Sequence, residues 1–506
     1  MATRRNYWII STKFTFFTMS EIIYLSKKMG TPGKGYWDQT FINDILMSLN
    51  VESDRTIVII PGAYQGELVH KINEFLSQYK KVLVFITSDE EGKFDCGKLW
   101  HPDIIHYRQY GYCEHNRLFP IGYTSDTRKI LKKIGLVEKD IDNFYAGQLN
   151  SDERRNLASF MVSIPKTVFF GTDGFSRGLP QDMYYDYLAH AKYAPAPGGH
   201  VSPDSFRFYE ALEAGCIPVQ FPRYLADLFP DIPFDPKKPY QQNANNIFAW
   251  WQKQKMLLRQ KIKDDLDIHE AMTIVVSTSP IKSHPSTDII DQTIKSIRHH
   301  TPMDIILMID GVRDEQKNMS NDYTEYIRRL LWKCNFEYEN VMPLLFEKHL
   351  HQSGMLRETL PYIKTPLMMY VEHDTPLVTD EPIDWEYISQ SILDSTANVV
   401  RLHYEAVIPE VHKPLMIPEK DRPFLMATRQ WSQRPHVART HFYREIMKFF
   451  SPNANCFIED FIYGQCLEAN WDLWKLFIYN PGKNLKRSLN LDGRAGGQKF
   501  DDRQIW

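Results

Sequence analysis

Short runs of apolar, mostly β-branched residues alternate with segments of helical spacing along the first half of the chain. The runs Arg55–Pro61 (RTIVIIP) and Lys81–Thr87 (KVLVFIT) are predicted to be buried strands. Asn150 and Glu153 form a capping-box pattern, which predicts a helix that runs to Met161. Short apolar strands between helices favour a mostly parallel sheet that is covered on both faces. Further strands are expected at Ile104–Tyr107, Phe144–Gly147, Thr167–Gly171 and Ile217–Phe221, and further helices at Gln65–Tyr79, Asp182–Ala191 and Ser205–Ala214.

A polar connector, Pro236–Glu270, separates this pattern from a second one of the same kind. The connector opens with PKKPYQQNANN and continues as a polar helix predicted at Ile247–Leu266. Beyond it, strands are expected at Met272–Ser277, Asp304–Asp310 and Leu367–Val371, and helices at Asp288–His299 and Glu315–Trp332. We therefore expect an α/β protein with an N-terminal extension at 1–50, a first module at 51–265 with lobes at 51–140 and 141–235, a connector at 236–270 and a second module at 271–506.

Composition limits the classes of function. Of the 506 residues, 43% are hydrophobic and 24% charged, which is typical of globular domains. The formal net charge of -3 argues against nucleic acid as a partner, because proteins that follow a phosphate backbone carry a basic surplus. The 6 cysteines include no Cys-x-x-Cys pair, which argues against a zinc ribbon. The apolar stretch Asn6–Met19 is too short for a membrane span, so no integral membrane segment is expected.

The clearest candidate binding site is Pro197–Val219, which reads PGGHVSPDSFRFYEALEAGCIPV. Its Gly-rich loop permits close approach of a ligand, and the helix start that follows offers free N–H groups to a diphosphate. Arg207 adds a fork of donors, and Glu210 on the same helix face suits the hydroxyls of a ribose. The alternative is an ordinary helix–turn–strand unit with an Arg207–Glu210 salt bridge. The loop and cap residues of the candidate site are Gly199, Ser202 and Ser205.

This segment resembles the hallmark of the exostosin family of glycosyltransferases, which is a Gly-rich loop followed by Ser-Phe-Arg, Glu-Ala-Leu and Gly-Cys-Ile-Pro-Val. Upstream, Tyr145–Gln148 followed by Arg154-Arg155 is similar to the strand and basic pair of that family, and the likeness spans residues 140–235. The resemblance implies a GT-B fold, in which two Rossmann-like lobes bind the nucleotide at the strand ends of the C-terminal lobe.

The same resemblance assigns roles to residues. It implies that Arg207, with Arg154 or Arg155, contacts the diphosphate, that Glu210 contacts the ribose, and that this module needs no metal. Residues 141–235 would then hold the nucleotide sugar and residues 51–140 the acceptor. The acceptor lobe matches no known pattern, and its candidates for the catalytic base are Glu67, His70, Asp89 and Glu114.

An acid-x-acid pattern, Glu372-His373-Asp374, follows a predicted buried strand in the second half. Residues i and i+2 of a strand share a side, so Glu372 and Asp374 present two carboxylates together, and such oxygen ligands suit Mn²⁺ or Mg²⁺. An ion held there bridges a nucleotide diphosphate and stabilises it as a leaving group. The alternative is an acidic loop of no special function.

The order of features in this half resembles the GT-A fold of glycosyltransferases and its Asp-x-Asp motif, which here is Glu-x-Asp. The resemblance implies that Ser277 and Thr278 lie where a uracil or guanine ring docks, and that Asp310 binds the base or ribose. It also implies that Glu459 or Asp460 is the general base for an acceptor hydroxyl, whereas a helix-capping acidic pair is the alternative. Further candidates for phosphate or acceptor binding are Arg434, His436, Arg439 and His441.

Together these patterns predict a bifunctional glycosyltransferase, in which a GT-B module precedes a GT-A module, as in animal exostosins but without their membrane anchor. It would transfer sugars from UDP- or GDP-linked donors to hydroxyls of a glycan acceptor, with Mn²⁺ or Mg²⁺ in the second module. We expect a soluble cytoplasmic enzyme of a microbe or a virus. The alternatives are one active module beside a degenerate glycan-binding one, a non-catalytic glycan-binding scaffold, and a nucleotidyltransferase. The last is disfavoured because no Gly-rich, Lys-containing loop follows Met272–Ser277.

Overall fold

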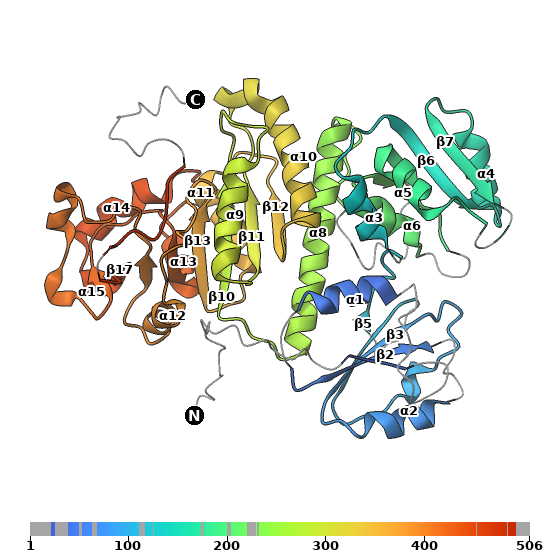
Figure 1. Ribbon diagram of the computed structural model, residues 1–506, viewed down its shortest axis with the longest axis horizontal. Helices are drawn as coiled ribbons and strands as arrows, with labels where there is room; N and C mark the ends of the chain where they lie inside the picture. Colours follow the sequence, from blue (N-terminus) through green and yellow to red (C-terminus); the bar gives the residue numbers. More distant parts are fainter. Residues whose placement is uncertain are drawn as a thin grey trace. The chain divides into compact units, whose positions relative to one another are not determined.

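The chain folds into two compact units, which divide between Ile268 and His269 (Figure 1). The first unit contains the described residues of Phe16–Ile268 and the second those of His269–Trp506. This computed structural model confirms the predicted α/β class, because both units are built on Rossmann-like parallel strands flanked by helices. The residues that the structure describes are 22–25, 39–49, 53–62, 68–110, 117–124, 126–172, 174, 177–199, 204–219, 229, 232–451, 453–482 and 484–491.

A parallel sheet of 5 strands forms the first lobe of the first unit, in the order β1-β2-β3-β4-β5. Strands β2 (Thr56–Pro61) and β3 (Val82–Thr87) confirm two predictions, and their side chains are almost all buried. Both are continuous apolar runs because helices and loops cover both of their faces. The other elements are β1 (Ile22–Tyr24), β4 (Ile104–Arg108), β5 (Arg117–Leu118), α1 (Thr40–Met47), α2 (Val69–Leu76) and η4 (Cys96–Lys98).

The second lobe contains a parallel sheet of 4 strands in the order β7-β6-β8-β9. The chain adds β7 on one side of β6 and then returns to add β8 and β9 on the other side. The strand order therefore reverses between β6 and β8, and open α/β sheets bind ligands at the carboxyl ends of strands beside such a reversal. The elements are β6 (Ile141–Gln148), β7 (Thr167–Thr172), β8 (Ala191–Pro195), β9 (Ile217–Val219), α3 (Thr127–Ile134), α4 (Asp152–Met161), α5 (Gln181–His190) and α6 (Phe206–Glu213).

A helix of 26 residues, α8 (Tyr240–Asp265), follows the second lobe (Figure 1). It begins earlier than predicted, and it is not simply polar, because Trp250 and Trp251 are buried. The Trp251 ring stacks on Phe41 of α1 at a centroid distance of 5.7 Å, and Trp250 meets Phe229 at 5.3 Å. These contacts belong to one apolar core that includes residues of both lobes, so α8 joins the two lobes.

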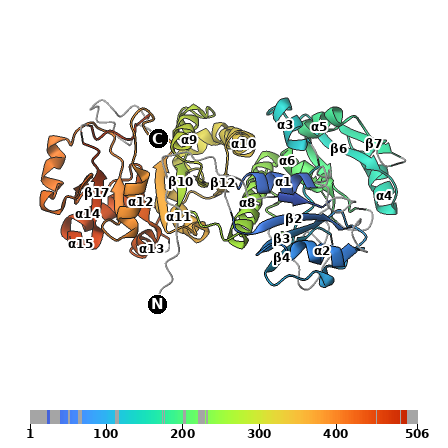
Figure 2. The same ribbon diagram turned by 60° about the horizontal axis from the view of Figure 1, so that its bottom comes forward.

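The second unit is built on a mixed sheet of 8 strands in the order β12-β11-β10-β13-β16-β14-β17-β15. In its parallel half, β11 and β12 follow on one side of β10 and β13 is added on the other, so the order reverses between β10 and β13. Figure 2 shows α9 and α10 on one face of this half and α11 on the other. The elements are β10 (Met272–Thr278), β11 (Ile305–Ile309), β12 (Val341–Leu345), β13 (Leu367–Glu372), α9 (Asp288–His300), α10 (Ser320–Phe336) and α11 (His351–Thr359).

The other half of this sheet contains antiparallel pairs that the sequence patterns do not predict. Strand β16 (His436–Arg439) pairs antiparallel with both β13 and β14 (Val399–Arg401). Strand β17 (Leu476–Tyr479) pairs parallel with β14 and antiparallel with β15 (Leu425–Ala427). Such short strands show too few residues for a hydrophobic period to be recognised. The remaining elements are α12 (Trp385–Leu393), α13 (Thr440–Met447), α14 (Ile458–Glu468), α15 (Trp471–Trp474), η5 (Asp314–Met319), η6 (Leu360–Tyr362), η7 (Glu410–Leu415) and η8 (Pro418–Lys420).

Two further predicted helices are present, but each begins later than predicted. Helix α4 begins after Ser151, whose hydroxyl accepts the N–H of Arg154 at 3.3 Å, so Ser151 rather than Asn150 is the capping residue. The single helix predicted at Glu315–Trp332 begins as the 3-10 turn η5 and becomes α-helical only at Ser320. No helix in the described part of the chain is both long enough and apolar enough to cross a membrane.

Candidate active site

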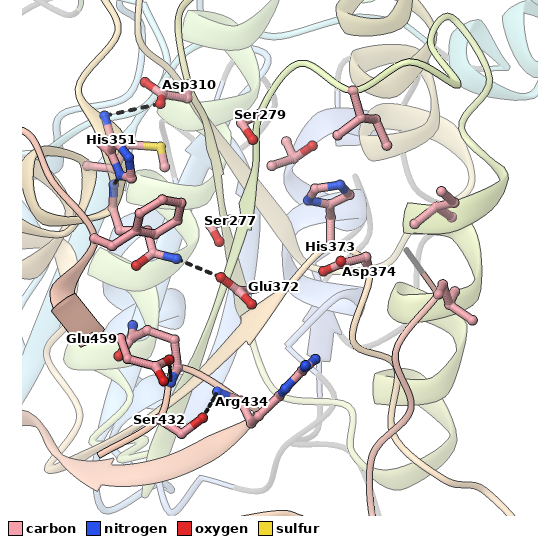
Figure 3. Close-up of a pocket in the computed structure, with 18 of the residues that line it drawn as sticks. Ser277, Ser279, Asp310, His351, Glu372, His373, Asp374, Ser432, Arg434 and Glu459 are labelled. Atoms are coloured by element: carbon pink, nitrogen blue, oxygen red, sulfur yellow. Dashed lines mark hydrogen bonds between the residues drawn. The ribbon is translucent and has the colours of Figure 1, made fainter. Parts of the chain in front are cut away.

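The carboxyl ends of β10, β11 and β13 border a cleft of about 790 Å³ in the second unit (Figure 3). The cleft lies where the strand order reverses, which is where open α/β sheets bind their ligands. It collects most of the residues that the sequence analysis assigned to the second module, although these residues are far apart in the sequence. The predicted residues that line it are Ser277, Thr278, Asp310, Glu372, Asp374, Arg434, Glu459 and Asp460. The structure thus brings them together, while their roles stay predictions.

The two predicted metal ligands, Glu372 and Asp374, both line the cleft (Figure 3). Glu372 is held in place, since its N–H donates to Thr375 Oγ1 at 3.2 Å and its Oε1 accepts from Gln352 Nε2 at 2.6 Å. Among the described residues, no group of three or more His, Cys, Asp or Glu side chains is placed to hold a metal ion. Mg²⁺ commonly binds one or two carboxylates together with substrate phosphates and water, so this lining is compatible with the predicted cation, which stays a prediction.

The carboxylate of Asp310, which follows β11, already accepts several hydrogen bonds from the protein. Its Oδ1 accepts the backbone N–H groups of Gly311 at 2.9 Å and Leu350 at 2.7 Å, and its Oδ2 accepts that of His351 at 3.1 Å. Oδ2 also lies 2.8 Å from Nδ1 of His349. A carboxylate has about four lone-pair positions, so these donors leave Asp310 little capacity for the predicted contact with a base or ribose.

Ser277 and Thr278 end β10, and their hydroxyls bond to buried tyrosines. Ser277 Oγ lies 2.9 Å from the hydroxyl of Tyr370, and Thr278 Oγ1 lies 2.9 Å from that of Tyr326. Burial raises the pKa of both tyrosines, which therefore stay neutral hydroxyls at physiological pH. A nucleotide base that docks at this strand end would thus have to share these hydroxyls with the two tyrosines.

The acidic pair Glu459-Asp460 lies in the first turn of α14 and lines the same cleft. Glu459 Oε2 accepts the backbone N–H of Gln433 at 3.0 Å, which fixes the orientation of that carboxylate. Neither residue caps the helix, because the N-cap position is Phe457, which makes no side-chain cap. The purely capping interpretation of this acidic pair is therefore not supported by the contacts.

Two arginines add positive charge to the cleft. Arg401, which ends β14, is buried and donates to Gln430 Oε1 at 3.1 Å, and burial lowers its pKa to about 10. Arg434 lies with its guanidinium carbon 4.4 Å from the centre of the Tyr404 ring. Within the described residues neither guanidinium forms a salt bridge with a carboxylate. Arg434 thus lies at the cleft without a described salt bridge, and its predicted contact with a phosphate or an acceptor stays a prediction. The charge of Glu459 acts on Arg401.

The other basic candidates lie away from the cleft. His436 is fully buried, with Nε2 2.6 Å from the hydroxyl of Tyr443, and burial lowers its pKa to about 4. Arg439 donates to the Ser395 hydroxyl at 3.0 Å, and His441 is exposed. The sequence analysis in turn missed polar residues that do line the cleft. The one signal among them was Arg401, which interrupts the apolar run Val399–Leu402. These missed residues include Gln352, Arg401 and His403.

The predicted loop–helix site of the first unit lies at the carboxyl ends of β6 and β8, beside the reversal of strand order. Arg154 is buried and donates to the carbonyl of Gly198 in the Gly-rich loop and to Asn150 Oδ1 at 3.1 Å. Arg207 Nε donates to the carbonyl of Ala146 at 2.9 Å. Burial, and after it the charge of Arg207, lower the pKa of Arg154. Two guanidinium groups thus lie close together, an arrangement that an anion would stabilise.

Gly147 makes room for one of these arginines. A Cβ added at Gly147 would collide with the guanidinium of Arg207, which also lies 5.4 Å from the centre of the Tyr145 ring. Gly147 therefore lets Arg207 lie against the end of β6. Arg155, in contrast, is exposed and donates to Asp152 at 2.6 Å on its own helix. Of the two alternatives in the basic pair, Arg154 is the one at the loop.

Glu210 is buried among hydroxyl groups. Its Oε1 accepts from Thr124 Oγ1 at 2.7 Å and from the Tyr185 hydroxyl at 3.0 Å, and its Oε2 accepts from the Tyr184 hydroxyl at 2.8 Å. No described contact joins Glu210 to Arg207, so the alternative of an internal salt bridge is wrong. The contact with a ribose stays a prediction. The ribose would have to bond to a carboxylate that already accepts from three hydroxyls of the protein.

The remaining predicted residues of this unit are less informative. Ser205 is the N-cap residue of α6, but its side chain caps no N–H group. Gly199 follows Gly198 in the loop, and Ser202 lies outside the described residues. Among the candidates for an acceptor-lobe base, Asp89 is buried and accepts from Arg108 at 2.6 Å, which indicates a structural role. His70 is exposed on α2, and Glu67 and Glu114 lie outside the described residues.

Comparisons with known proteins do not establish a family. No family model matches the chain, and no curated protein is similar to it. Among solved structures, S. aureus TarS is 11% identical, with a TM-score of 0.28 over 42% of this chain and 36% of that one. UDP-glucose pyrophosphorylase complexed with UDP-glucose is 11% identical, with a TM-score of 0.27 over 43% of this chain and 92% of that one. The chain thus spans well under two thirds of the length of TarS.

Proposed function

We propose that the chain is a glycosyltransferase that uses a nucleotide sugar, and that its second unit carries the metal-dependent catalytic centre with a GT-A-like arrangement. The observation that carries this proposal is the gathering of two acidic pairs, Glu372 with Asp374 and Glu459 with Asp460, in one cleft at a reversal of strand order. A transfer from a nucleotide sugar needs both a cation site for the leaving diphosphate and a base for the acceptor hydroxyl. The cleft offers carboxylates for each.

On the donor side, Glu372 and Asp374 would hold Mn²⁺ or Mg²⁺ together with the diphosphate oxygens of a UDP- or GDP-linked sugar. When bound, this ion supplies positive charge that stabilises the departing nucleoside diphosphate. Arg401 and Arg434 would add further positive charge, because neither forms a described salt bridge, although the charge of Glu459 acts on Arg401. The end of β10 at Ser277-Thr278 and the rigid Asp310 would form the wall against which the nucleoside lies.

On the acceptor side, Glu459 or Asp460 would take the proton from the attacking hydroxyl of a glycan. Proton transfer in the transition state requires a carboxylate with a fixed orientation, and the contact of Glu459 with the Gln433 N–H supplies one. Glu459 is therefore the preferred base of the two. The bond that forms joins the acceptor oxygen to the sugar, and the bond that breaks joins the sugar to the diphosphate.

For the first unit we propose a second, metal-independent transferase module with a GT-B arrangement, which would make the chain bifunctional in glycan synthesis. Its support is the pair Arg154 and Arg207 at another reversal of strand order, next to the Gly-rich loop. The alternative is a degenerate module that only binds glycan. That alternative is favoured by Glu210, whose carboxylate already accepts from three hydroxyls of the protein.

The test is a panel of UDP- and GDP-linked sugars incubated with the full chain, with Mn²⁺ and with EDTA, while release of the nucleoside diphosphate is measured. We expect at least one donor to be hydrolysed slowly without acceptor and faster with a glycan acceptor. EDTA should remove the activity of the second unit, whereas any activity of the first unit should remain. If no donor is turned over, but a nucleoside triphosphate and a sugar phosphate release pyrophosphate, the chain is a nucleotidyltransferase and the proposal is wrong.

A further inference from the structure

One segment of the second unit, His349–Gly354, touches both the donor and the acceptor side of the cleft; we refer to it as the junction segment. It includes the start of α11. Its first part is anchored to Asp310, which accepts the N–H groups of Leu350 and His351. A Cβ on the neighbouring Gly311 would collide with the backbone of Lys348 and His349. The junction segment therefore lies tightly against the end of β11.

His351 in this segment adopts a backbone conformation that is rare for a residue with a side chain. Its φ is 58°, in the left-handed region, and such residues cost free energy unless their surroundings hold them. The hydrogen bond to Asp310 and an edge-on contact with the ring of Phe457 at 4.1 Å hold His351 here. Backbone strain of this kind is concentrated at functional sites.

The other side of the junction segment carries the loop that leads into α14. Ser353 Oγ donates to the carbonyl of Ala454 at 2.9 Å and accepts the N–H of Cys456 at 3.0 Å. A Cβ on Gly354 would lie 2.8 Å from Asn455 Oδ1, so the glycine permits the close approach of this loop. The junction segment thus holds the loop that leads into α14, the helix that carries Glu459.

Gln352 links these two sides through a single amide group. Its Nε2 donates to Glu372 Oε1 at 2.6 Å, while its Oε1 accepts the N–H of Ile458 at 3.3 Å. Ile458 is the first residue of α14 and directly precedes Glu459. The Gln352 side chain and its bond to the Ile458 N–H are buried, whereas Glu372 is half-buried at the cleft. Only a side chain with one donor end and one acceptor end makes both contacts.

We propose that Gln352 is a positioning residue that couples the two halves of the reaction, by fixing the Glu372 carboxylate for the cation and the start of α14 for the base. The inference rests on the proposed function, because it concerns the ligands assigned there. Hydrogen-bond partners of metal ligands are known to change metal affinity or activity by about 10–100-fold when they are removed. Gln352 is such a partner for Glu372.

The test uses Gln352→Met in the full chain, because methionine has nearly the same shape but neither a donor nor a strong acceptor. Mn²⁺ is titrated calorimetrically into the wild-type chain and the variant, each saturated with UDP. We expect the Kd for Mn²⁺ to rise by about 10-fold or more. With a donor sugar at saturating Mn²⁺, kcat should fall while the KM for the donor changes less than twofold. The matched control is Gln316→Met, since Gln316 is also buried in this unit and, among the described residues, its side chain donates to the carbonyl of Pro280 alone, at 3.4 Å.

The outcomes separate this inference from the proposed function. If the Mn²⁺ affinity of Gln352→Met equals that of the wild type, or falls no more than that of Gln316→Met, Gln352 is merely structural and the inference is wrong. If Mn²⁺ binds the wild type and weakens in Gln352→Met, but no nucleotide sugar is ever turned over, the positioning role stands and the proposed function fails. If the wild type with UDP does not bind Mn²⁺, both are wrong.

Discussion

Both units place predicted polar residues at a reversal of strand order. The two sites differ in how many hydrogen bonds these residues already form within the protein. In the first unit, Glu210 is buried and accepts from three protein hydroxyls, and Arg154 and Arg207 donate to backbone carbonyls. In the second unit, Glu372 and Asp374 line an open cleft, and Arg401 and Arg434 have no described salt bridge. A reversal of strand order is therefore present at two sites with different capacity for a ligand.

This difference teaches that the position of a residue at a strand end is not sufficient evidence of a role. A carboxylate contributes to binding or catalysis through lone pairs that the protein leaves open, and a saturated carboxylate acts mainly as structure. By this criterion Asp310 resembles Glu210 more than it resembles Asp374, although Asp310 lies in the cleft. The strongest functional residues are then the two acidic pairs of the second unit.

The largest expected effect comes from the acceptor base. Glu459→Gln should lower the kcat for transfer by about 10²–10⁴-fold, because general-base catalysis contributes roughly that factor. Asp460→Asn is the matched variant one residue further along α14, and it should have a much smaller effect. The affinity for UDP with Mn²⁺, measured by calorimetry, should be unchanged in both. If kcat fell equally in the two variants, the hydrogen bond from the Gln433 N–H to Glu459 would not decide which carboxylate acts as the base.

A smaller effect, on stability instead of activity, should follow from Glu210→Gln in the first unit. The amide nitrogen cannot accept a hydrogen bond, so at least one buried hydroxyl of Thr124, Tyr184 or Tyr185 loses its acceptor, at a cost of about 1–3 kcal/mol. Denaturant unfolding should report this loss, while Mn²⁺-dependent donor turnover stays unchanged. The control is Glu74→Gln on the exposed face of α2.

The opposite result for Glu210→Gln would break the comparison between the two units. If its stability equalled that of Glu74→Gln, and if an EDTA-resistant transfer activity disappeared, the Glu210 carboxylate would be a ligand for the donor. The first unit would then be an active module, and the saturation of a carboxylate in the structure would be a poor guide to its role.

The sequence predicted the fold well where strands are long and fully buried. Runs such as those of β2, β3 and β10 are recognisable because both of their faces are covered and most of their positions are apolar. The strands β14 to β17 were missed because they have only three or four residues each. Their partners are distant in the sequence, so only the tertiary structure makes them strands.

The candidate site was predicted where the chemistry is local in the sequence, and missed where it is not. Glu372-His373-Asp374 and Glu459-Asp460 are short patterns at the ends of recognisable elements. Gln352 has no such pattern, because its role depends on simultaneous contact with Glu372 and Ile458, which are far from it in the sequence. The saturation of Asp310 and Glu210 was equally hidden, since their partners come from distant segments.

The most direct test of the central claim compares Asp374→Asn with Asp380→Asn. Both remove one carboxylate after β13, but Asp374 lines the cleft whereas Asp380 is exposed outside it. With the donor sugar identified from the panel, the measurement is kcat/KM at a fixed Mn²⁺ concentration. We expect the kcat/KM of Asp374→Asn to fall by at least about 100-fold, because losing a metal ligand should cost more than losing a hydrogen-bond partner of a ligand. The kcat/KM of Asp380→Asn should match that of the wild type. Equal activities of the two variants would contradict the account.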